Sequence, residues 1–152
     1  MTRTSNVKSI LADVNVWLAT LVAEYPHHDA ATDWWREAVL PAGEDVAFCR
    51  LTQLGLLRLL SSESIMGRQR LNHADAWAAV AAVAAQASVK FLEEPTGIDE
   101  HLADLCSRER SSPGFWSDAY LAAFARAGRY RFVTFDRVFR RFEGLELLLL
   151  SG

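Results

Sequence analysis

The stretch SILADVNVWLA (residues 9–19) places an aspartate, Asp13, between two apolar runs of different character. VKSILA (7–12) is typical of a short buried strand, and VNVWLATLVA (14–23) is expected to be a helix. A charge at such a junction has three explanations: a helix cap, an incidental surface position, or part of a site. The strand that leads directly into a helix is the first indication of an α/β fold.

Outward from this stretch, short apolar strands continue to alternate with helices. The strands look buried on both faces, which favours a parallel sheet covered by helices. No repeat or Pro/Gly/Ser-rich linker interrupts the pattern, so residues 1–152 are expected to form one domain, an α/β sandwich with a mainly parallel sheet. Further strands are expected over 45–49, 89–92 and 130–135, helices over 14–23, 27–40, 51–62, 72–87, 97–108 and 117–128, and a helical turn over 136–142, before the apolar run 145–150.

Capping and breaking residues predict several helix ends. Asn72 and Ser117 are suited to cap the helices that they precede or begin, and Gly128 is suited to end one. Pro41 and Gly43 are expected to break the second helix at residue 40. The helix over 51–62 is expected to present one continuous apolar face, formed by its leucines at 51, 54, 57 and 60.

Composition favours a soluble protein of the cytoplasm. The longest apolar run, LELLLL (145–150), falls far below the roughly 18 residues needed to span a bilayer. The first 14 residues lack the apolar core of a secretory signal. Cys49 and Cys106 form no C-x-x-C pair and are expected to be core thiols in a reducing compartment.

The net charge of −3 argues against a protein that coats nucleic acid through bulk electrostatics. Of the 16 basic residues, however, 14 are arginine, and the segment 101–152 carries 8 basic against 6 acidic residues. Because the arginine guanidinium matches phosphate geometry, a local phosphate-binding patch remains compatible with the acidic total. Among candidates for such a groove, Arg137, Arg140 and Arg141, the last two are adjacent and cannot point in the same direction.

Three aspartates occupy similar junctions. Asp13 and Asp136 each follow a predicted strand and open a helical segment, and Asp118 opens the helix predicted over 117–128. Singly, each is explained by capping, since aspartate accepts hydrogen bonds from free N–H groups at a helix start. Jointly, the parallel sheet places the strand ends carrying Asp13 and Asp136 on one edge, where ligands bind in such folds.

Three carboxylates gathered at one edge repel one another and raise each other's pKa unless a cation neutralises them. Mg²⁺ or Mn²⁺ suits oxygen ligands and leaves positions for phosphate oxygens. Such an ion activates water for attack on a phosphodiester, so no nucleophilic side chain is needed. The sequence has no G-x-S-x-G, P-loop, G-x-G-x-x-G or H-E-x-x-H motif, and its histidines are expected to be structural or exposed.

The segments LADVNVWLA, WSDAYLAAFARAG and FVTFDRVFRRF, in this order and at this spacing, resemble the PIN domain, specifically the VapC toxins of type II toxin-antitoxin pairs. The similarity extends over about residues 9–147. It implies a PIN-like three-layer sandwich and a Mg²⁺- or Mn²⁺-dependent endoribonuclease, with Asp13, Asp118 and Asp136 as both catalytic and metal-binding residues. It further implies a cognate VapB-like antitoxin, a homodimer, and tRNA or rRNA as substrate.

Many PIN domains carry a fourth acid, a glutamate, on the helix after the second strand. Gln53 is the corresponding residue here, and it supplies an amide oxygen but no negative charge. Gln53 is therefore either a neutral supporting residue or a plain helix residue. Asn15 and Thr134 are the other supporting candidates, because each lies two residues from a site aspartate and can orient a carboxylate or a water.

Two other functions stay open. The absence of a fourth acid motivates a catalytically weakened PIN-like module that binds RNA or a partner without cutting. An aspartate-nucleophile phosphotransferase also carries an aspartate after its first strand. It needs a well-placed lysine, and only Lys8 and Lys90 are present.

Overall fold

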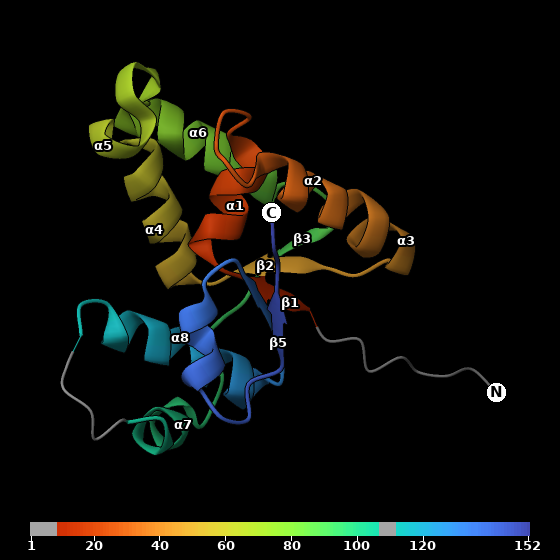
Figure 1. Cartoon of the computed structure of the whole chain (residues 1–152), viewed down its shortest axis with the longest axis vertical. Coiled ribbons are helices and arrows are strands. Elements are labelled where there is room, and N and C mark those ends of the chain that lie inside the picture. The colour runs from red at the N-terminus through yellow and green to blue at the C-terminus, as the bar shows by residue number, and fades with distance from the viewer. Residues whose placement is uncertain (1–8, 107–111) are drawn as a thin grey trace.

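The computed structural model describes residues 9–106 and 112–152 (Figure 1). Within these ranges the centre of the molecule is a five-stranded sheet, and all four neighbouring pairs of strands run parallel. The predicted parallel sheet is therefore confirmed. Its order is β3-β2-β1-β4-β5, with bounds β1 Ile10–Ala12, β2 Val46–Phe48, β3 Val89–Phe91, β4 Arg131–Thr134 and β5 Leu147–Leu149.

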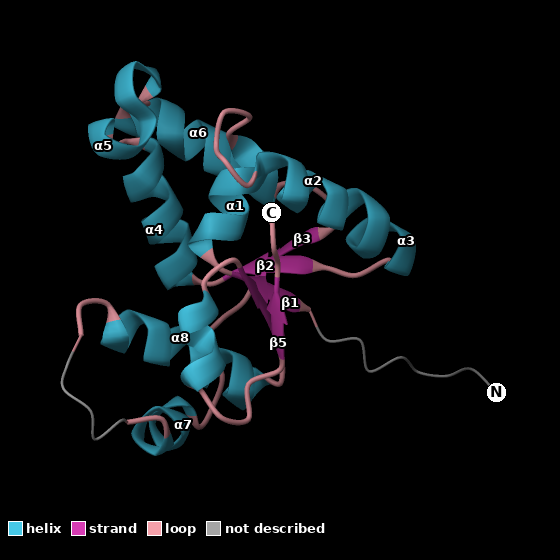
Figure 2. Ribbon diagram, in the orientation of Figure 1, coloured by secondary structure: helices cyan, strands magenta, loops and turns pink. Residues whose placement is uncertain are grey.

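Helices cover both faces of this sheet, which confirms the three-layer sandwich (Figure 2). One face carries α1 (Val14–Leu21), α2 (His28–Trp34), α4 (Arg50–Leu60) and α6 (His73–Ala84). The other carries α7 (Ile98–Asp104) and α8 (Phe115–Gly128). The remaining segments are the π-helical turn η1 (Trp35–Val39), α3 (Leu40–Ala42), α5 (Glu63–Met66), and the 3-10 helices η2 (Gly67–Gln69) and η3 (Arg137–Arg141).

The strand side chains divide between two apolar cores. Ile10 and Ala12 of β1 pack with α1, α4 and α6, whereas Leu11 between them packs with α8. Val133 and Phe132 of β4 divide in the same way. This alternation is the two-residue period of a strand, and it leaves both faces of β1 and β4 buried. The two central strands thus hold their carboxyl ends in fixed positions.

Helix α2 does not break at residue 40 as predicted. The helical segment continues through η1 and α3. It ends at Gly43, whose φ of 64° is left-handed. In η1 the Leu40 N–H donates to the Trp35 carbonyl, so the helix is widened immediately before Pro41. A widened turn accommodates the proline ring, which would clash with the preceding turn of a regular α-helix.

The predicted leucine face of α4 is wrong. The buried residues of this helix are Thr52, Leu56 and Leu60, and Leu54 is 54% exposed. Each residue of an α-helix is rotated by about 100° from the one before, so residues three apart differ by about 60° around the axis. The leucines at 51, 54, 57 and 60 therefore spread over half the helix circumference. The expected cap of α6 is confirmed, since Asn72 Oδ1 accepts a hydrogen bond from the Asp75 N–H at 2.8 Å.

Helix α8 begins earlier than predicted, at Phe115, behind the left-handed Gly114 (φ 80°), and Ser117 lies inside it rather than capping it. Helix α7 ends at Asp104, and residues 107 and 108 of the helix predicted over 97–108 lie outside the described residues. Of the two cysteines, Cys49 is buried as expected and Cys106 is exposed, so the second expectation is wrong. None of the described helices combines the length and apolarity that crossing a membrane requires.

Candidate functional site

Asp13 lies at the junction of β1 and α1 and is almost fully buried, with 9% of its surface exposed. Its Oδ1 accepts a hydrogen bond from the Val14 N–H at 2.7 Å, so it caps the helix. Its Oδ2 accepts a second bond, from the Thr134 hydroxyl, also at 2.7 Å. One carboxylate oxygen of Asp13 therefore caps α1, and the other connects it to the end of β4.

Asn15 and Thr134, the predicted supporting residues, both contact Asp13. The Asn15 amide nitrogen donates to Asp13 Oδ2 (3.4 Å) and to Thr134 Oγ1 (3.2 Å), and its amide oxygen accepts from the Phe135 N–H (3.2 Å). Thr134 Oγ1 also accepts from the Asp136 N–H at 3.0 Å. These bonds fasten the carboxyl ends of β1 and β4 to each other.

Asp136 is the exposed member of the cluster. It caps η3, since its Oδ1 accepts a hydrogen bond from the Val138 N–H at 3.0 Å. Because Ala12 pairs with Val133 in the sheet, the residues that follow these strands, Asp13 and Asp136, share the same edge. The expectation that parallel strands bring these two aspartates to one edge is confirmed.

Asp118 differs from its predicted position at a helix start. It lies in the first turn of α8, four residues after Gly114, whose carbonyl accepts its N–H. Its Oδ2 accepts a hydrogen bond from Arg141 Nη2 at 3.4 Å. The Arg141 guanidinium also lies over the rings of Phe115 (5.1 Å) and Phe142 (4.9 Å). Asp118 is thus held by an arginine from η3, a contact that the sequence did not reveal.

The three carboxylates interact electrostatically. Burial, together with the smaller effect of the negative charges of Asp118 and Asp136, raises the pKa of Asp13 to about 6 against the opposing hydrogen bonds from Thr134 and Val14. The pKa of Asp118 is also raised, by burial and then by Asp136, while Arg141 lowers it. The effect of neighbouring carboxylates on the pKa values of Asp13 and Asp118 requires that the three aspartates lie near one another.

Asp13 has no cationic side chain within ion-pair distance in the part of the chain that the structure describes. A buried carboxylate without a cation is unfavourable when ionised, and two further carboxylates nearby increase that cost. The oxygen donors fit a hard divalent cation by their chemistry. As they stand, however, no three His, Cys, Asp or Glu side chains in the ranges 9–106 and 112–152 are gathered closely enough to hold one.

Comparison with known proteins agrees with this arrangement. The family model described as PIN domain matches residues 10–145, which carry all three aspartates. The chain belongs to the PIN-domain family. Ribonuclease VapC41 of Mycobacterium tuberculosis is 36% identical over 146 residues, an alignment that covers 93% of this chain and 99% of that protein. The likeness to VapC proteins inferred from the three aspartate segments is therefore confirmed.

Solved structures show the same fold as this PIN domain. VapBC2 from Rickettsia felis, bound to a DNA fragment from its promoter, has a TM-score of 0.68 at 11% identity, covering 95% of this chain and 100% of that one. VapC20 of M. tuberculosis, described as a Sarcin-Ricin loop cleaving toxin, has a TM-score of 0.63 at 21% identity, covering 91% and 98%. At these identities the likeness establishes the fold alone.

Gln53, which the sequence suggests as the counterpart of a fourth acid, is turned toward its own helix. Its amide oxygen accepts a hydrogen bond from Arg50 Nη1, and the Arg50 guanidinium lies 4.7 Å from the centre of the Phe91 ring. No described contact joins Gln53 to any of the three aspartates. The structure therefore brings Asn15 and Thr134 to Asp13 but does not bring Gln53 there.

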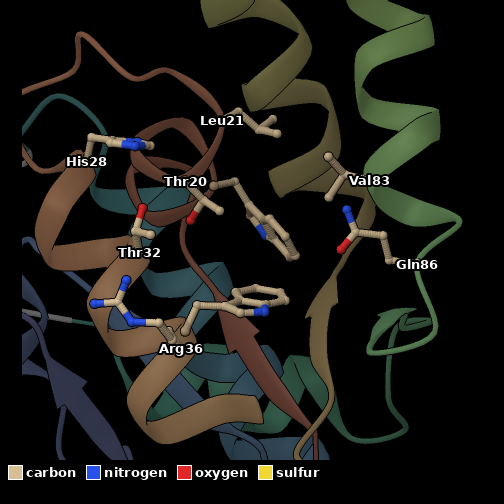
Figure 3. A pocket seen from close by; sticks show the side chains of 9 residues that line it. Thr20, Leu21, His28, Thr32, Arg36, Val83 and Gln86 are labelled. Atoms are coloured by element: carbon tan, nitrogen blue, oxygen red, sulfur yellow. The ribbon is translucent and has the colours of Figure 1, made fainter.

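The apolar hollow of the PIN domain is separate from the aspartates. It measures about 340 Å³ and lies between α1, the α2–η1 segment and the end of α6 (Figure 3). Leu21 and Val83 face each other across it, with Thr20 and Thr32 on the α1 and α2 sides. None of its lining residues belongs to the carboxylate cluster, so this hollow is not part of the candidate site.

Proposed function

We propose that this PIN domain is the toxin of a type II toxin-antitoxin pair, a Mg²⁺- or Mn²⁺-dependent endoribonuclease that hydrolyses RNA phosphodiester bonds with water as nucleophile. Two relatives support the reaction class: the protein 36% identical over nearly its whole length is named a ribonuclease, and VapC20 is described as cleaving the Sarcin-Ricin loop. Structured RNA, tRNA or rRNA, is accordingly the proposed substrate.

The observation that carries the proposal is the buried, cation-free carboxylate of Asp13 beside Asp118 and Asp136. We assign all three aspartates as catalytic residues that hold the metal. When bound, a divalent cation lowers the pKa of water and stabilises the negative charge that develops on the phosphate. Asp118 must leave Arg141 to take part, and Asp136, whose Oδ1 caps η3, would contribute through its other carboxylate oxygen.

The remaining residues of the site position these carboxylates. Asn15 and Thr134 fix the orientation of Asp13 through its Oδ2, and the helix cap fixes its Oδ1. Gln53 is proposed as a neutral supporting residue at the start of α4, a role that requires it to release Arg50. Fixed donors and acceptors lower the reorganisation that the site needs when charge develops.

A VapB-like antitoxin is the proposed partner. Several solved structures with this fold are toxin-antitoxin complexes, among them VapBC2 of Rickettsia felis and VapBC-1 of nontypeable Haemophilus influenzae. The homodimer, the cytoplasmic location and the single domain over residues 1–152 remain predictions from the sequence.

Cleavage assays test the proposal directly. Purified protein is incubated with tRNA and rRNA in Mg²⁺, in Mn²⁺ and in EDTA, and cleavage is expected only with a divalent cation. Asp13→Asn is expected to abolish it, whereas Asp99→Asn, the same change at an exposed position of α7, is expected to leave it intact. If the wild type is as inert as Asp13→Asn on all RNAs yet binds them, the protein is the catalytically weakened binding module that the neutral Gln53 favours.

A further inference from the structure

A second, polar hollow lies beside the aspartate cluster. It measures about 420 Å³ and is lined by His27, Phe135, Arg137 and Arg140 together with the last residues of the described chain, 149–152. Phe135 stands between Thr134 and Asp136 in the chain, so the hollow begins one residue from the candidate site. We call it the Arg137/Arg140 pocket.

The geometry of η3 places both arginines on one side. In a 3-10 helix, with three residues per turn, side chains at i and i+3 stand above each other. Arg137 and Arg140 have this spacing and both line the pocket, while Arg141 points elsewhere, to Asp118. The expectation that the adjacent Arg140 and Arg141 diverge is thereby confirmed.

Neither pocket arginine has an ion-pair partner among the described residues. In residues 9–106 and 112–152 no carboxylate lies within ion-pair distance of Arg137 or Arg140. By contrast, Arg36, Arg70, Arg126, Arg131 and Arg141 all have acidic partners. Two unpaired guanidinium groups that share one hollow repel each other unless an anion lies between them.

His27 adds a further polar group to this pocket. Its ring stacks on Phe135, with centroids 4.4 Å apart and planes within 11°, and its buried Nδ1 has no hydrogen-bond partner among the described residues. Phe135 in turn donates its N–H to Asn15 Oδ1, the residue that holds Asp13. Phe135 therefore connects the pocket to the residues that hold Asp13.

We propose that the Arg137/Arg140 pocket binds a phosphodiester group of the substrate RNA. This group lies close, along the RNA strand, to the bond that is cut. The inference rests on the proposed ribonuclease function. Arginine binds phosphate oxygens through two parallel N–H groups, which favours a phosphate over a single carboxylate. A volume of about 420 Å³ is within the range of roughly 300–1,000 Å³ typical of ligand pockets and exceeds what a lone inorganic ion needs.

RNA binding without cleavage tests the proposal. In an Asp13→Asn background, the affinity for a fluorescent RNA oligonucleotide that the wild type cleaves is measured across salt concentrations. Arg137→Gln and Arg140→Gln are each expected to weaken binding about tenfold, and to reduce the slope of log affinity against log salt by about 0.7 per lost contact with single-stranded RNA. Arg68→Gln, which removes the same charge from η2, is expected to change neither.

Oligonucleotides with one uncharged methylphosphonate linkage then locate the contact. An uncharged linkage at one position near the cleavage site is expected to weaken RNA binding by the Arg68→Gln protein about tenfold. The same linkage is expected to leave RNA binding by the Arg137→Gln/Arg140→Gln protein unchanged. A fluorescent acidic peptide is measured in parallel.

The proposal is overturned if the two pocket variants bind RNA like Arg68→Gln, if no single linkage accounts for their loss, or if they lose affinity only for the acidic peptide. Failure of the proposed function looks different, because it appears as absence of RNA cleavage by the wild type in Mg²⁺ and Mn²⁺. With Asp13 intact, Mn²⁺ binding by Arg137→Gln and Arg140→Gln is expected to stay close to that of the wild type, which separates loss of a phosphate contact from damage to the aspartate cluster.

Discussion

The Thr134 hydroxyl donates a hydrogen bond of 2.7 Å to Asp13 Oδ2 across 121 residues of sequence. The bond connects the carboxyl ends of two neighbouring parallel strands, β1 and β4. It also opposes the rise in the pKa of Asp13, because a hydrogen bond to a carboxylate favours the charged form. Thr134 thus affects the charge of the central carboxylate through one hydrogen bond.

Thr134→Val is expected to raise the pKa of Asp13 above its value of about 6, since the shape is kept and the donor is lost. It is also expected to lower the free energy of unfolding by about 1–3 kcal/mol, because the N–H groups of Asn15 and Asp136 lose their acceptor. Carbon-detected NMR titration of the Asp13 carboxyl and urea unfolding measure the two effects. Thr134→Ser keeps the hydroxyl and serves as control; an Asp13 pKa unchanged in the valine variant would show that the hydroxyl does not stabilise the carboxylate.

Stability is expected to depend on pH through Asp13. Its pKa of about 6 in the folded chain exceeds the ordinary 3.8, so between these pH values the folded state binds the proton more tightly than the unfolded chain. Asp13 therefore lowers the free energy of unfolding progressively as pH rises from about 4 to about 6, by up to about 3 kcal/mol.

This contribution is isolated by comparing the wild type with Asp13→Asn in EDTA. The advantage of the variant in free energy of unfolding is expected to grow by up to about 3 kcal/mol between pH 4 and pH 7. Adding Mg²⁺ at pH 7 is expected to restore stability to the wild type alone. A difference between the two proteins that stays constant with pH would contradict the assignment of the raised pKa to burial of Asp13.

Arg141 is expected to compete with the metal for Asp118. Arg141→Gln removes the guanidinium that lies 3.4 Å from the Asp118 carboxylate, and the cluster then gains net negative charge. Because both side chains are partly exposed to solvent, we expect the dissociation constant for Mn²⁺ to fall only about two- to fivefold, as measured by calorimetry or electron paramagnetic resonance. Arg141→Lys retains the positive charge and is expected to keep an affinity near that of the wild type; equal affinities of all three proteins would exclude the competition.

The contact between α1 and α4 has little tolerance for added volume. A Cβ at Gly55 would lie 2.8 Å from Val14 Cγ2, in the first turn after Asp13. Gly55→Ala is therefore expected to lower the free energy of unfolding by about 1–3 kcal/mol despite the better helix propensity of alanine. Removing the opposing methyl groups with Val14→Ala is expected to make the double variant more stable than the sum of the two single effects. Urea unfolding of the four proteins measures this coupling, and strict additivity would show that the two positions do not touch.

Local pattern was sufficient for the order of strands and helices, because the apolar runs that it detects are those that the sheet buries. Helix ends were harder to predict. The last long helix was expected to begin at Ser117, yet the left-handed φ of Gly114 lets α8 begin at Phe115. Pro41 suggested a break, yet the wide turn of η1 carries the helix past it. In both cases the deciding factor is a backbone conformation that residue type alone does not specify.

In the candidate site, too, the sequence predicts some contacts and not others. Asp13 follows β1 directly and Asp136 lies two residues after β4, so parallel pairing is enough to bring them to one edge, and the alternation of side chains is enough to place Thr134 beside them. The contact between Arg141 and Asp118 spans 23 residues, and that between Gln53 and Arg50 depends on which way two flexible side chains turn. Tertiary packing decides the first contact. Helical spacing makes Arg50 and Gln53 neighbours, but it does not specify that Gln53 turns to Arg50 rather than to the aspartates.

Because η3 has three residues per turn, its successive side chains point into three different surroundings. Phe139 and Phe142 enter the core, Arg137 and Arg140 line the pocket, and Arg141 reaches the first turn of α8. Substitution at one of these positions changes one environment and leaves the others in place. Deletion of Val138 would shift every later side chain by one position, moving Arg140 into the core position of Phe139 and the Phe142 ring to the place of Arg141 beside Asp118. Evolution can therefore vary the composition of this segment but not its length.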